Sequence, residues 1–287
     1  MKLNDIAISE AIIREFNKDF LDYLNVDVAI VGAGPSGIVA AYYLAKEKVK
    51  VMILERKLSI GGGMWGGGMM FNKIVVQKKA KFILDEFGVS YKVSSRSPKS
   101  GYYVADSVEA VSTLTSKAAK AGAKFFNLIF VEDIRTKKKK IEGLVINWSP
   151  VEISKLHIDP LAISAKFIID ATGHPAEIAN ILVKKMGKRL STKTGDILGE
   201  KTMYADKGET DILKNSREIY PNLYVSGMAA NAVFGAPRMG PIFGGMLLSG
   251  QIVAKKILDR ISKSKVKGQS DNIKFKIKKE KKEKKRE

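Results

Sequence analysis

Apolar and polar positions alternate along the chain with periods that predict both helices and strands. From Ser9 to Leu24, apolar residues recur every three or four positions, which predicts an amphipathic N-terminal helix. A short apolar run then leads from Val28 into a glycine-rich turn, and a helical stretch follows. Val49 to Leu54 has the composition of a second strand. A strand, a helix and a strand in this order predict a βαβ unit.

The rest of the chain continues this succession of predicted elements. Asp106 and Gly122 are suited to begin and end a helix between them. Six glycines within residues 61–70 predict a segment without regular structure, lying against an extended ligand. The other predicted helices are residues 76–88 and 240–260, and the other predicted strands are residues 102–105, 124–131, 141–148, 162–169 and 222–226, with a charged hairpin turn at 137–140.

The stretch VAIVGAGPSG, residues 28–37, has the spacing of a dinucleotide-binding turn. Gly32 permits the tight turn, Gly34 lets the backbone approach a pyrophosphate, and Gly37 lets the helix lie close to the strand. Ser36 and the neighbouring amides offer hydrogen-bond donors to an anion at the helix N-terminus. Glu55, at the end of the second strand, can accept hydrogen bonds from a ribose diol. We therefore expect this unit to bind a dinucleotide.

The order of the predicted elements indicates the fold. A first βαβ unit, an inserted section with antiparallel character, a late strand ending in ATG and a final strand–glycine–helix are typical of an α/β protein. We expect a doubly wound, Rossmann-like sheet of the two-dinucleotide-binding flavoprotein type. Residues 1–261 would form a single catalytic domain, and residues 262–287 a basic, disordered tail.

Composition and charge narrow the classes of function. The 287 residues include no Cys, which excludes disulfides, thiolate-bound zinc, iron–sulfur clusters and a thiol nucleophile. We expect a cytoplasmic protein, because the charged N-terminus does not resemble a signal peptide and no long apolar run predicts a membrane span. The net charge of +20 suits a protein that binds phosphorylated anions. Residues 263–287 contribute twelve Lys or Arg against four Asp or Glu, and we interpret them as a solvated tail rather than a nucleic-acid site.

Histidine and arginine residues in the second half of the chain are candidates for the chemistry. His157 and Asp159 lie two positions apart in LHIDP and would share one face of an extended segment. His174 follows the strand-end ATG, where ligands bind in α/β sheets. Imidazole and carboxylate together suit a divalent metal such as Fe(II). Arg238, in the loop FGAPRMGP, could bind a carboxylate with two hydrogen bonds. Spacing alone does not rank the other acids that could complete a metal site, Asp170, Glu177 and Asp196.

Several motifs together resemble the thiazole synthase family of thiamine biosynthesis. They are VAIVGAGPSG, LERKLSIGGGMWGGGMMF, VINWSPVEI, LHIDP, DATGH and GMAANAVFGAPRMGPIFGGMLLSG, and they extend from about residue 9 to about residue 260. The resemblance implies that NAD is a substrate, that its ADP-ribose part condenses with glycine, and that sulfur is then added. In the fungal and plant branch a protein Cys donates the sulfur, whereas here His157 occupies that position. The chain therefore resembles the archaeal branch, which uses iron and free sulfide and can turn over.

The resemblance also implies roles for individual residues. Asp159 and His174 match the iron ligands of the family, and Arg238 matches the residue that binds the glycine carboxylate. His157 is a candidate proton shuttle for the successive enolisations. The family forms octamers that share sites between subunits, so that the ligands could come from two chains. The residues that match its nucleotide contacts are Ser36, Glu55, Arg56, Gly63, Val131, His157, Ile158, Asp159 and Met228.

Three other functions remain open from the sequence. A phosphosugar isomerase acting on ribose 1,5-bisphosphate would need two phosphate sites, which the abundant Lys and Arg could supply. A flavin-dependent oxidoreductase could be built on the same fold. A non-catalytic nucleotide or nucleic-acid binder could act through the basic tail.

Overall fold

An eight-stranded sheet forms the centre of the protein, which we describe from a computed structural model of residues 2–94 and 101–283, with side chains as far as Ser264 at the C-terminal end. Five strands run parallel in the order β11-β9-β1-β2-β6, and β10 joins β11 in antiparallel orientation. Their bounds are Asn25–Val31 for β1, Val51–Glu55 for β2, Lys124–Asn127 for β6, Leu161–Asp170 for β9, Glu218–Tyr220 for β10 and Leu223–Val225 for β11.

Two antiparallel sections are added to this sheet. The hairpin of β7 (Ile129–Lys137) and β8 (Lys140–Trp148) pairs through β8 with the first half of β9. A separate three-stranded sheet has the order β3-β5-β4, with bounds Lys73–Gln77, Tyr102–Asp106 and Tyr91–Val93. The predicted doubly wound α/β fold with an inserted antiparallel section is thus confirmed.

Alternate residues of the central strands face two separate cores. In β1, Val28 and Ile30 belong to one buried cluster, and Ala29 and Val31 belong to the other. Both faces of the parallel sheet are therefore covered, which explains the continuous apolar run. The first core includes residues of α2 (Pro35–Lys46), α3 (Lys81–Phe87), α4 (Ser107–Ala121) and α9 (Gly244–Glu283), and the second those of β7, β8, α6 (Glu177–Met186), α7 (Ala205–Asn215) and α8 (Met228–Phe234).

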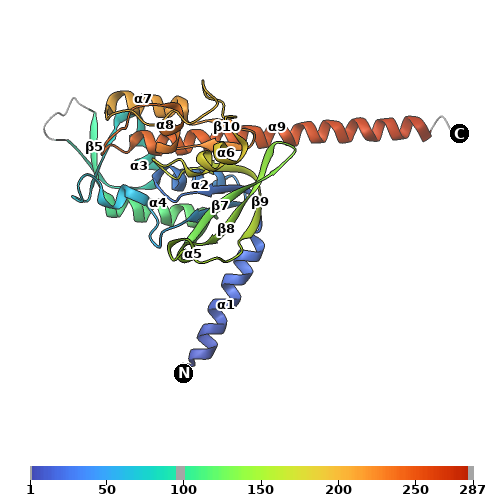
Figure 1. The fold of residues 1–287 in the computed structure, drawn as a ribbon, viewed down its shortest axis with the longest axis horizontal. Helices are drawn as coiled ribbons and strands as arrows, with labels where there is room; N and C mark the ends of the chain where they lie inside the picture. Colours follow the sequence, from blue (N-terminus) through green and yellow to red (C-terminus); the bar gives the residue numbers. More distant parts are fainter. Residues whose placement is uncertain (1, 95–100, 284–287) are drawn as a thin grey trace.

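Helix α1 (Asp5–Asp22) projects away from the rest of the chain (Figure 1). Asn4 caps it by accepting hydrogen bonds from the amides of Ile6 and Ala7. Only its last turns pack on the body, where Phe16 and Phe20 lie edge-on to Phe126. The helix has no buried residue, so its apolar side is largely without cover among the described residues.

Most predicted elements are present, and some of the differences have identifiable causes. Residues 76–88 are not one helix, because Lys73–Gln77 pairs with β5 as β3 and a 3-10 turn, Lys78–Ala80, precedes α3. Residues 124–131 form two strands, since Leu128 has a positive φ of 57° between them. The glycine-rich segment, expected to lack regular structure, contains a 3-10 turn at Gly62–Gly66. The short helices α5 (Ser149–Ile153), α6, α7 and α8 are not predicted.

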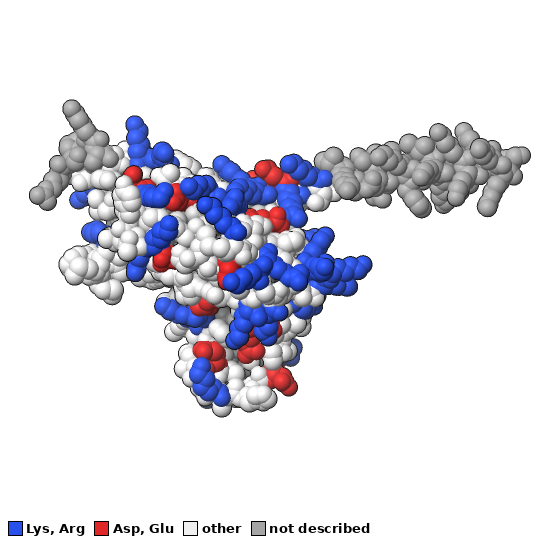
Figure 2. All heavy atoms as spheres, turned by 45° about the horizontal axis from the view of Figure 1, so that its top comes forward, with Lys and Arg blue, Asp and Glu red and all other residues white. Residues whose placement is uncertain are grey.

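The C-terminal helix extends into the segment that the sequence predicts as a tail. The backbone of α9 runs from Gly244 to Glu283, and residues 284–287 lie outside the described residues. That residues 262–287 are disordered in solution stays a prediction. Lys and Arg side chains cover more of the face shown in Figure 2 than Asp and Glu do. No helix in the part of the chain that the structure describes is long and apolar enough to cross a membrane.

Candidate functional site

A cavity of about 1060 Å³ lies at the carboxyl ends of β1, β2, β9 and β11. This is the edge at which open α/β sheets bind their ligands. Segments far apart in the sequence meet there, including the dinucleotide turn, the glycine-rich segment, the ATG strand end and the Arg238 loop, which we define as residues 235–243. The lining includes Gly34, Pro35, Ser36, Glu55, Arg56, Gly63, Met64, Thr172, His174, Glu200, Met228, Arg238, Gly240, Phe243 and Met246.

The three glycines of the dinucleotide turn have different surroundings. Gly32 has a φ of 99°, and a Cβ atom there would lie 2.4 Å from the carbonyl oxygen of Ala171. A Cβ atom on Gly37 would lie 2.2 Å from the carbonyl oxygen of Gly32. A Cβ atom on Gly34 would meet nothing within 4 Å, because this residue faces the cavity. The first and third glycines are therefore sterically required by the fold, whereas the second leaves open space for a ligand.

Glu55 is fixed at the edge of the cavity by backbone amides. It is 8% exposed; its Oε2 accepts a hydrogen bond from the amide of Ala33 at 2.8 Å and its Oε1 one from the amide of Lys57 at 2.9 Å. The carboxylate keeps further lone pairs for hydroxyl donors. The neighbouring Arg56 forms a 2.6 Å ion pair with Glu177, and burial raises the pKa of the Glu177 carboxyl.

The glycine-rich segment packs on the core through Met64 and Trp65, whereas Met69 and Met70 at its end are exposed. Met64 is fully buried, and the indole nitrogen of Trp65 donates to the carbonyl oxygen of Ile60 at 2.5 Å. The hydroxyl of Ser107 donates to the carbonyl oxygen of Trp65 at 2.7 Å. A Cβ atom on Gly63 would meet nothing within 4 Å, so the backbone at this residue is open to the cavity.

His174 and Glu200 form a pair inside the cavity. Nδ1 of His174 lies 2.8 Å from each carboxylate oxygen of Glu200, whose side chain is 18% exposed. This contact favours the tautomer in which Nδ1 carries the proton and Nε2 keeps its lone pair. Glu200 is not predicted from the sequence, because no spacing rule connects two residues 26 positions apart on different loops.

Arg238 and Met228 also line the cavity. Arg238 is exposed, and its guanidinium has no hydrogen bond or ion pair with any other described residue. Its backbone is well anchored: its amide donates to the carbonyl oxygen of Lys201 at 3.2 Å, and its carbonyl oxygen accepts from the amide of Tyr204 at 2.9 Å. A free guanidinium on an anchored backbone can bind an anion that enters the cavity.

Other predicted site residues lie away from this cavity. His157, Ile158 and Asp159 are exposed in the segment between α5 and β9, where the side-chain amide of Asn147 donates to the carbonyl oxygen of Ile158 at 3.0 Å. Val131, in β7, is 4% exposed and belongs to the second core. The structure of one chain therefore does not bring Asp159 to His174. Among the side chains that the structure describes, in residues 2–94 and 101–264, no group of three or more His, Asp or Glu is arranged to hold a metal ion.

The acids that spacing could not rank have structural partners. Asp170 is fully buried, accepts from the Thr172 hydroxyl at 2.7 Å and from the amide of Ala179 at 3.0 Å, and has its pKa raised by burial. Asp196 forms an ion pair with Lys188 at 3.3 Å. Neither residue lines the cavity, so both serve the fold in this chain.

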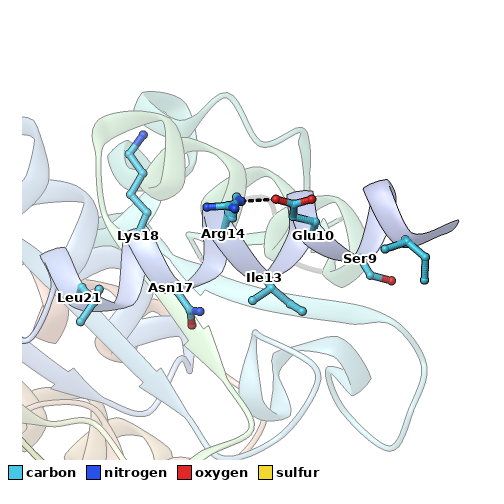
Figure 3. A pocket seen from close by; sticks show the side chains of 8 residues that line it. Ser9, Glu10, Ile13, Arg14, Asn17, Lys18 and Leu21 are labelled. Carbon is cyan, nitrogen blue, oxygen red and sulfur yellow. Dashed lines mark hydrogen bonds and ion pairs between the residues drawn. The ribbon is translucent and has the colours of Figure 1, made fainter. Parts of the chain in front are cut away.

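A second hollow follows one side of α1 (Figure 3). This open groove of about 780 Å³ is lined by residues of α1 itself, among them Ile6, Ile13 and Leu21. Arg14 and Glu10 form a 2.7 Å ion pair at its rim. Because side chains of a single helix line it, the groove is not enclosed from several sides by convergent polar groups, as a small-molecule site is.

Comparison with known proteins shows the family to which the chain is similar. Residues 9–243 match the Thi4 family. The chain is 58% identical over 261 residues to "Thiamine thiazole synthase" of Methanothermobacter thermautotrophicus, covering 91% of this chain and all of that protein. It is 54% identical over 259 residues to the protein of the same name from Pyrococcus horikoshii, covering 90% and 99%. The crystal structure of Thermovibrio ammonificans THI4 superposes with a TM-score of 0.87 at 52% identity, covering 91% of this chain and all of that one.

Proposed function

The chain belongs to the Thi4 family, and we propose that it is a thiamine thiazole synthase that makes an ADP-linked thiazole from NAD, glycine and free sulfide in an Fe(II)-dependent reaction. The observation that carries this proposal is the single cavity that joins the dinucleotide turn, His174 and Arg238. A site for joining a nucleotide to a small amino acid needs both partners in one space, since positioning replaces a multi-body encounter.

The lining of the cavity supports NAD as a substrate. Gly34 and Ser36 lie at the N-terminus of α2, where backbone amides and the helix dipole favour a pyrophosphate. Glu55 ends β2 and accepts a hydrogen bond from Ala33 of the dinucleotide turn, a place from which an acid can accept hydrogen bonds from a ribose. The volume of about 1060 Å³ suits a ligand of dinucleotide size. Arg56, Gly63 and Met228 complete the proposed nucleotide contacts.

Arg238 is the proposed partner of the glycine carboxylate. Its guanidinium forms no ion pair with another described residue, and a planar guanidinium can donate two parallel hydrogen bonds to a carboxylate. This role requires the Arg238 loop to hold the backbone of Arg238 in place, which its hydrogen bonds to Lys201 and Tyr204 support.

The absence of Cys supports free sulfide as the sulfur source. No residue of the chain carries a thiol that could be consumed as a donor. A synthase of this composition must therefore take sulfur from solution, and its protein would not be used up in one reaction. His157, at the position of the donor Cys in the fungal and plant branch, is exposed and remains a candidate proton shuttle.

Iron would be held by His174 and Asp159 if two chains combine their residues. Imidazole and carboxylate suit Fe(II), and Glu200 leaves Nε2 of His174 able to bind a metal. One chain alone supplies only His174 to the cavity, so we propose that Asp159 enters the cavity of a second copy. Bound Fe(II) would supply Lewis acidity and a template for sulfide.

Exposed apolar residues near Asp159 support a homo-oligomer. Trp148, Ile153 and Leu161 are 48%, 72% and 61% exposed around the segment that carries Asp159, and Ile6 and Ile13 of α1 are 76% and 58% exposed. Large apolar side chains gathered on one surface are typical of protein interfaces. We propose an octamer in which these surfaces are covered and the sites are shared.

The test of the reaction is an anaerobic incubation of the protein with Fe(II), NAD, glycine and sulfide, followed by mass spectrometry. We expect an ADP-thiazole that exceeds one equivalent per subunit and is absent when sulfide or iron is omitted. Intact NAD, with folded protein that isomerises ribose 1,5-bisphosphate, would assign the phosphosugar isomerase instead.

The test of the shared site is complementation between two inactive variants. Asp159→Ala and His174→Ala are each expected to be inactive alone. Unfolded and refolded together, they should form mixed oligomers in which some cavities carry both native ligands, and part of the activity should return. If mixed oligomers form without any return of activity, both ligands belong to one chain or one of them is wrongly assigned.

A further inference from the structure

A buried carboxyl group joins α7 to the start of α9. Glu209 is 8% exposed, and its Oε2 accepts hydrogen bonds from the amide of Gly245 at 2.6 Å and from the side-chain amide of Gln77 at 2.5 Å. Gln77 ends β3, Glu209 lies in α7, and Gly245 lies in the first turn of α9. Figure 1 shows α7 beside this end of α9. One side chain therefore connects three elements.

These three elements enclose the Arg238 loop. On the β3 side, the amide of Phe243 donates to the carbonyl oxygen of Val75 at 2.9 Å. On the α7 side, a Cβ atom on Gly208 would lie 2.8 Å from the carbonyl oxygen of Pro237. The loop then runs directly into α9, and Gly240, Phe243 and Met246 line the cavity. The position of the loop thus depends on how the three elements are held together, as well as on its backbone hydrogen bonds with Lys201 and Tyr204.

The start of α9 leaves room for the carboxyl group and for little else. A Cβ atom on Gly245 would lie 2.7 Å from Oε2 of Glu209 and 2.8 Å from Cγ2 of Ile212. A Cβ atom on Gly244 would lie 1.7 Å from Oε1 of Gln77. The glycine backbone of the helix start is therefore packed directly against the two polar side chains.

This arrangement has an energetic cost for the fold. Oε1 of Glu209 and Oε1 of Gln77 are both buried and have no hydrogen-bond partner among the described residues. Burial raises the pKa of Glu209 to about 7, so that the protonated form, whose Oε1–H is a donor, is accessible near neutrality. A buried polar group with an unmet acceptor destabilises a fold unless it serves another purpose.

We propose that Glu209 is a positioning residue that holds the Arg238 loop in the geometry in which Arg238 binds its carboxylate substrate. The guanidinium of Arg238 has no hydrogen bond with another described side chain, so its place in the cavity depends on its backbone alone. The naming of glycine as that substrate rests on the proposed function. The positioning of the loop does not, and it is measurable without any reaction.

The experiment compares Glu209→Ala and Glu209→Gln with Asp206→Asn, an exposed acid of the same helix, all as full-length protein. Hydrogen–deuterium exchange is followed by mass spectrometry over residues 236–245. We expect faster exchange there in Glu209→Ala and native exchange in Asp206→Asn. Glu209→Gln should restore most of the protection, because its amide oxygen can accept from Gly245 while its NH₂ group can donate to Oε1 of Gln77.

Steady-state kinetics of the same variants test the link to the substrate. In Glu209→Ala the KM for glycine should rise about tenfold or more while the KM for NAD changes little, since a small displacement of a positioning group has a large effect. Equal changes in both KM values, with native exchange at residues 236–245, would overturn the proposal. If no variant or wild-type protein makes a thiazole, exchange alone still decides the positioning role.

A second variant covers the case in which Glu209→Ala does not fold. Gln77→Ala removes one donor to Glu209 and leaves the carboxyl group in place. We expect a smaller increase in exchange over residues 236–245 and a smaller rise in the KM for glycine. Native exchange and native kinetics in a folded Gln77→Ala, together with a failure of Glu209→Gln to fold, would reduce Glu209 to a residue needed only for folding and so overturn the proposal.

Discussion

The two segments that carry the proposed iron ligands are held in very different ways. His174 follows a central strand, lines the cavity and contacts Glu200 through Nδ1. Asp159 lies in an exposed segment before β9, outside the cavity and among exposed apolar side chains. His174 has its contacts within one chain, whereas Asp159 lies on a surface with exposed apolar side chains, which is typical of a protein interface. If the proposed function holds, one chain is enough to bind the nucleotide, whereas metal binding needs two.

The largest expected effect separates these two regions directly. His174→Ala and Asp159→Ala should each lower thiazole formation by more than about a hundredfold, because each removes a proposed metal ligand. NAD binding should remain measurable in both, since neither residue shapes the dinucleotide turn. Iron content and NAD titration of the purified variants check this. Full iron occupancy in both variants would contradict the ligand assignment.

The pH dependence of stability tests whether Glu209, which is buried within one chain, has a raised pKa. Its pKa in the folded protein is about 7, above the ordinary value of 4.5. Between pH 4.5 and 7, Glu209 therefore keeps its proton in the folded protein and has lost it in the unfolded chain. Stability should therefore fall as pH rises from about 4.5 to 7, by about 3 kcal/mol at most. Denaturant unfolding should show a larger fall in wild type than in Glu209→Gln, in which residue 209 cannot titrate. Asp170 and Glu177, whose pKa values burial also raises, contribute equally to both proteins.

Two glycine variants test which glycine of the dinucleotide turn is needed for folding and which for NAD binding. Gly37→Ala should lower the free energy of unfolding by about 2–3 kcal/mol, because its Cβ atom would meet the backbone of Gly32. Gly34→Ala should change stability by less than about 0.5 kcal/mol yet weaken NAD binding, because its Cβ atom would project into the cavity. Chemical unfolding and NAD titration measure the two effects. Native NAD affinity in Gly34→Ala would move the pyrophosphate elsewhere.

Glu200 offers a finer test of the His174 region. Glu200→Ala should lower Fe(II) affinity by about tenfold to a hundredfold, because the imidazole loses the partner that fixes its tautomer and orientation. Glu200→Gln should have a smaller effect, since an amide oxygen can still accept from Nδ1. Competitive metal titration under anaerobic conditions distinguishes the variants. An unchanged affinity in Glu200→Ala would show that the pair at 2.8 Å does not serve the metal.

The smallest effect is expected from removal of residues 265–287. The described part of α9 packs on the core through Val253, Ala254 and Ile257, all upstream of the cut. Thiazole formation and the unfolding midpoint should stay close to those of the full chain. Loss of catalysis in a truncated protein that still folds would give the basic segment a role in the reaction.

Patterns confined to neighbouring residues could be predicted from the sequence. The dinucleotide turn has its strand, glycines and helix within residues 28–46, and Asp106 caps α4 by accepting from the amides of Val108 and Glu109, as its position before a helical run suggests. Such features depend on backbone geometry over a few residues. The family resemblance likewise rests on local motifs, which is why it could be recognised without a structure.

Contacts between distant segments were decided only by the tertiary structure. The pairing of His174 with Glu200, the burial of Val131 and the junction of Gln77, Glu209 and Gly245 join residues that no spacing rule relates. Lys73–Gln77 forms a strand because β5 lies beside it, although the sequence predicts that a helix begins at residue 76. Local patterns of residues specified which residue types the site could use and the order of the main elements. The packing of the chain decided which of them meet, because burial and hydrogen bonding depend on neighbours that only the folded chain brings together.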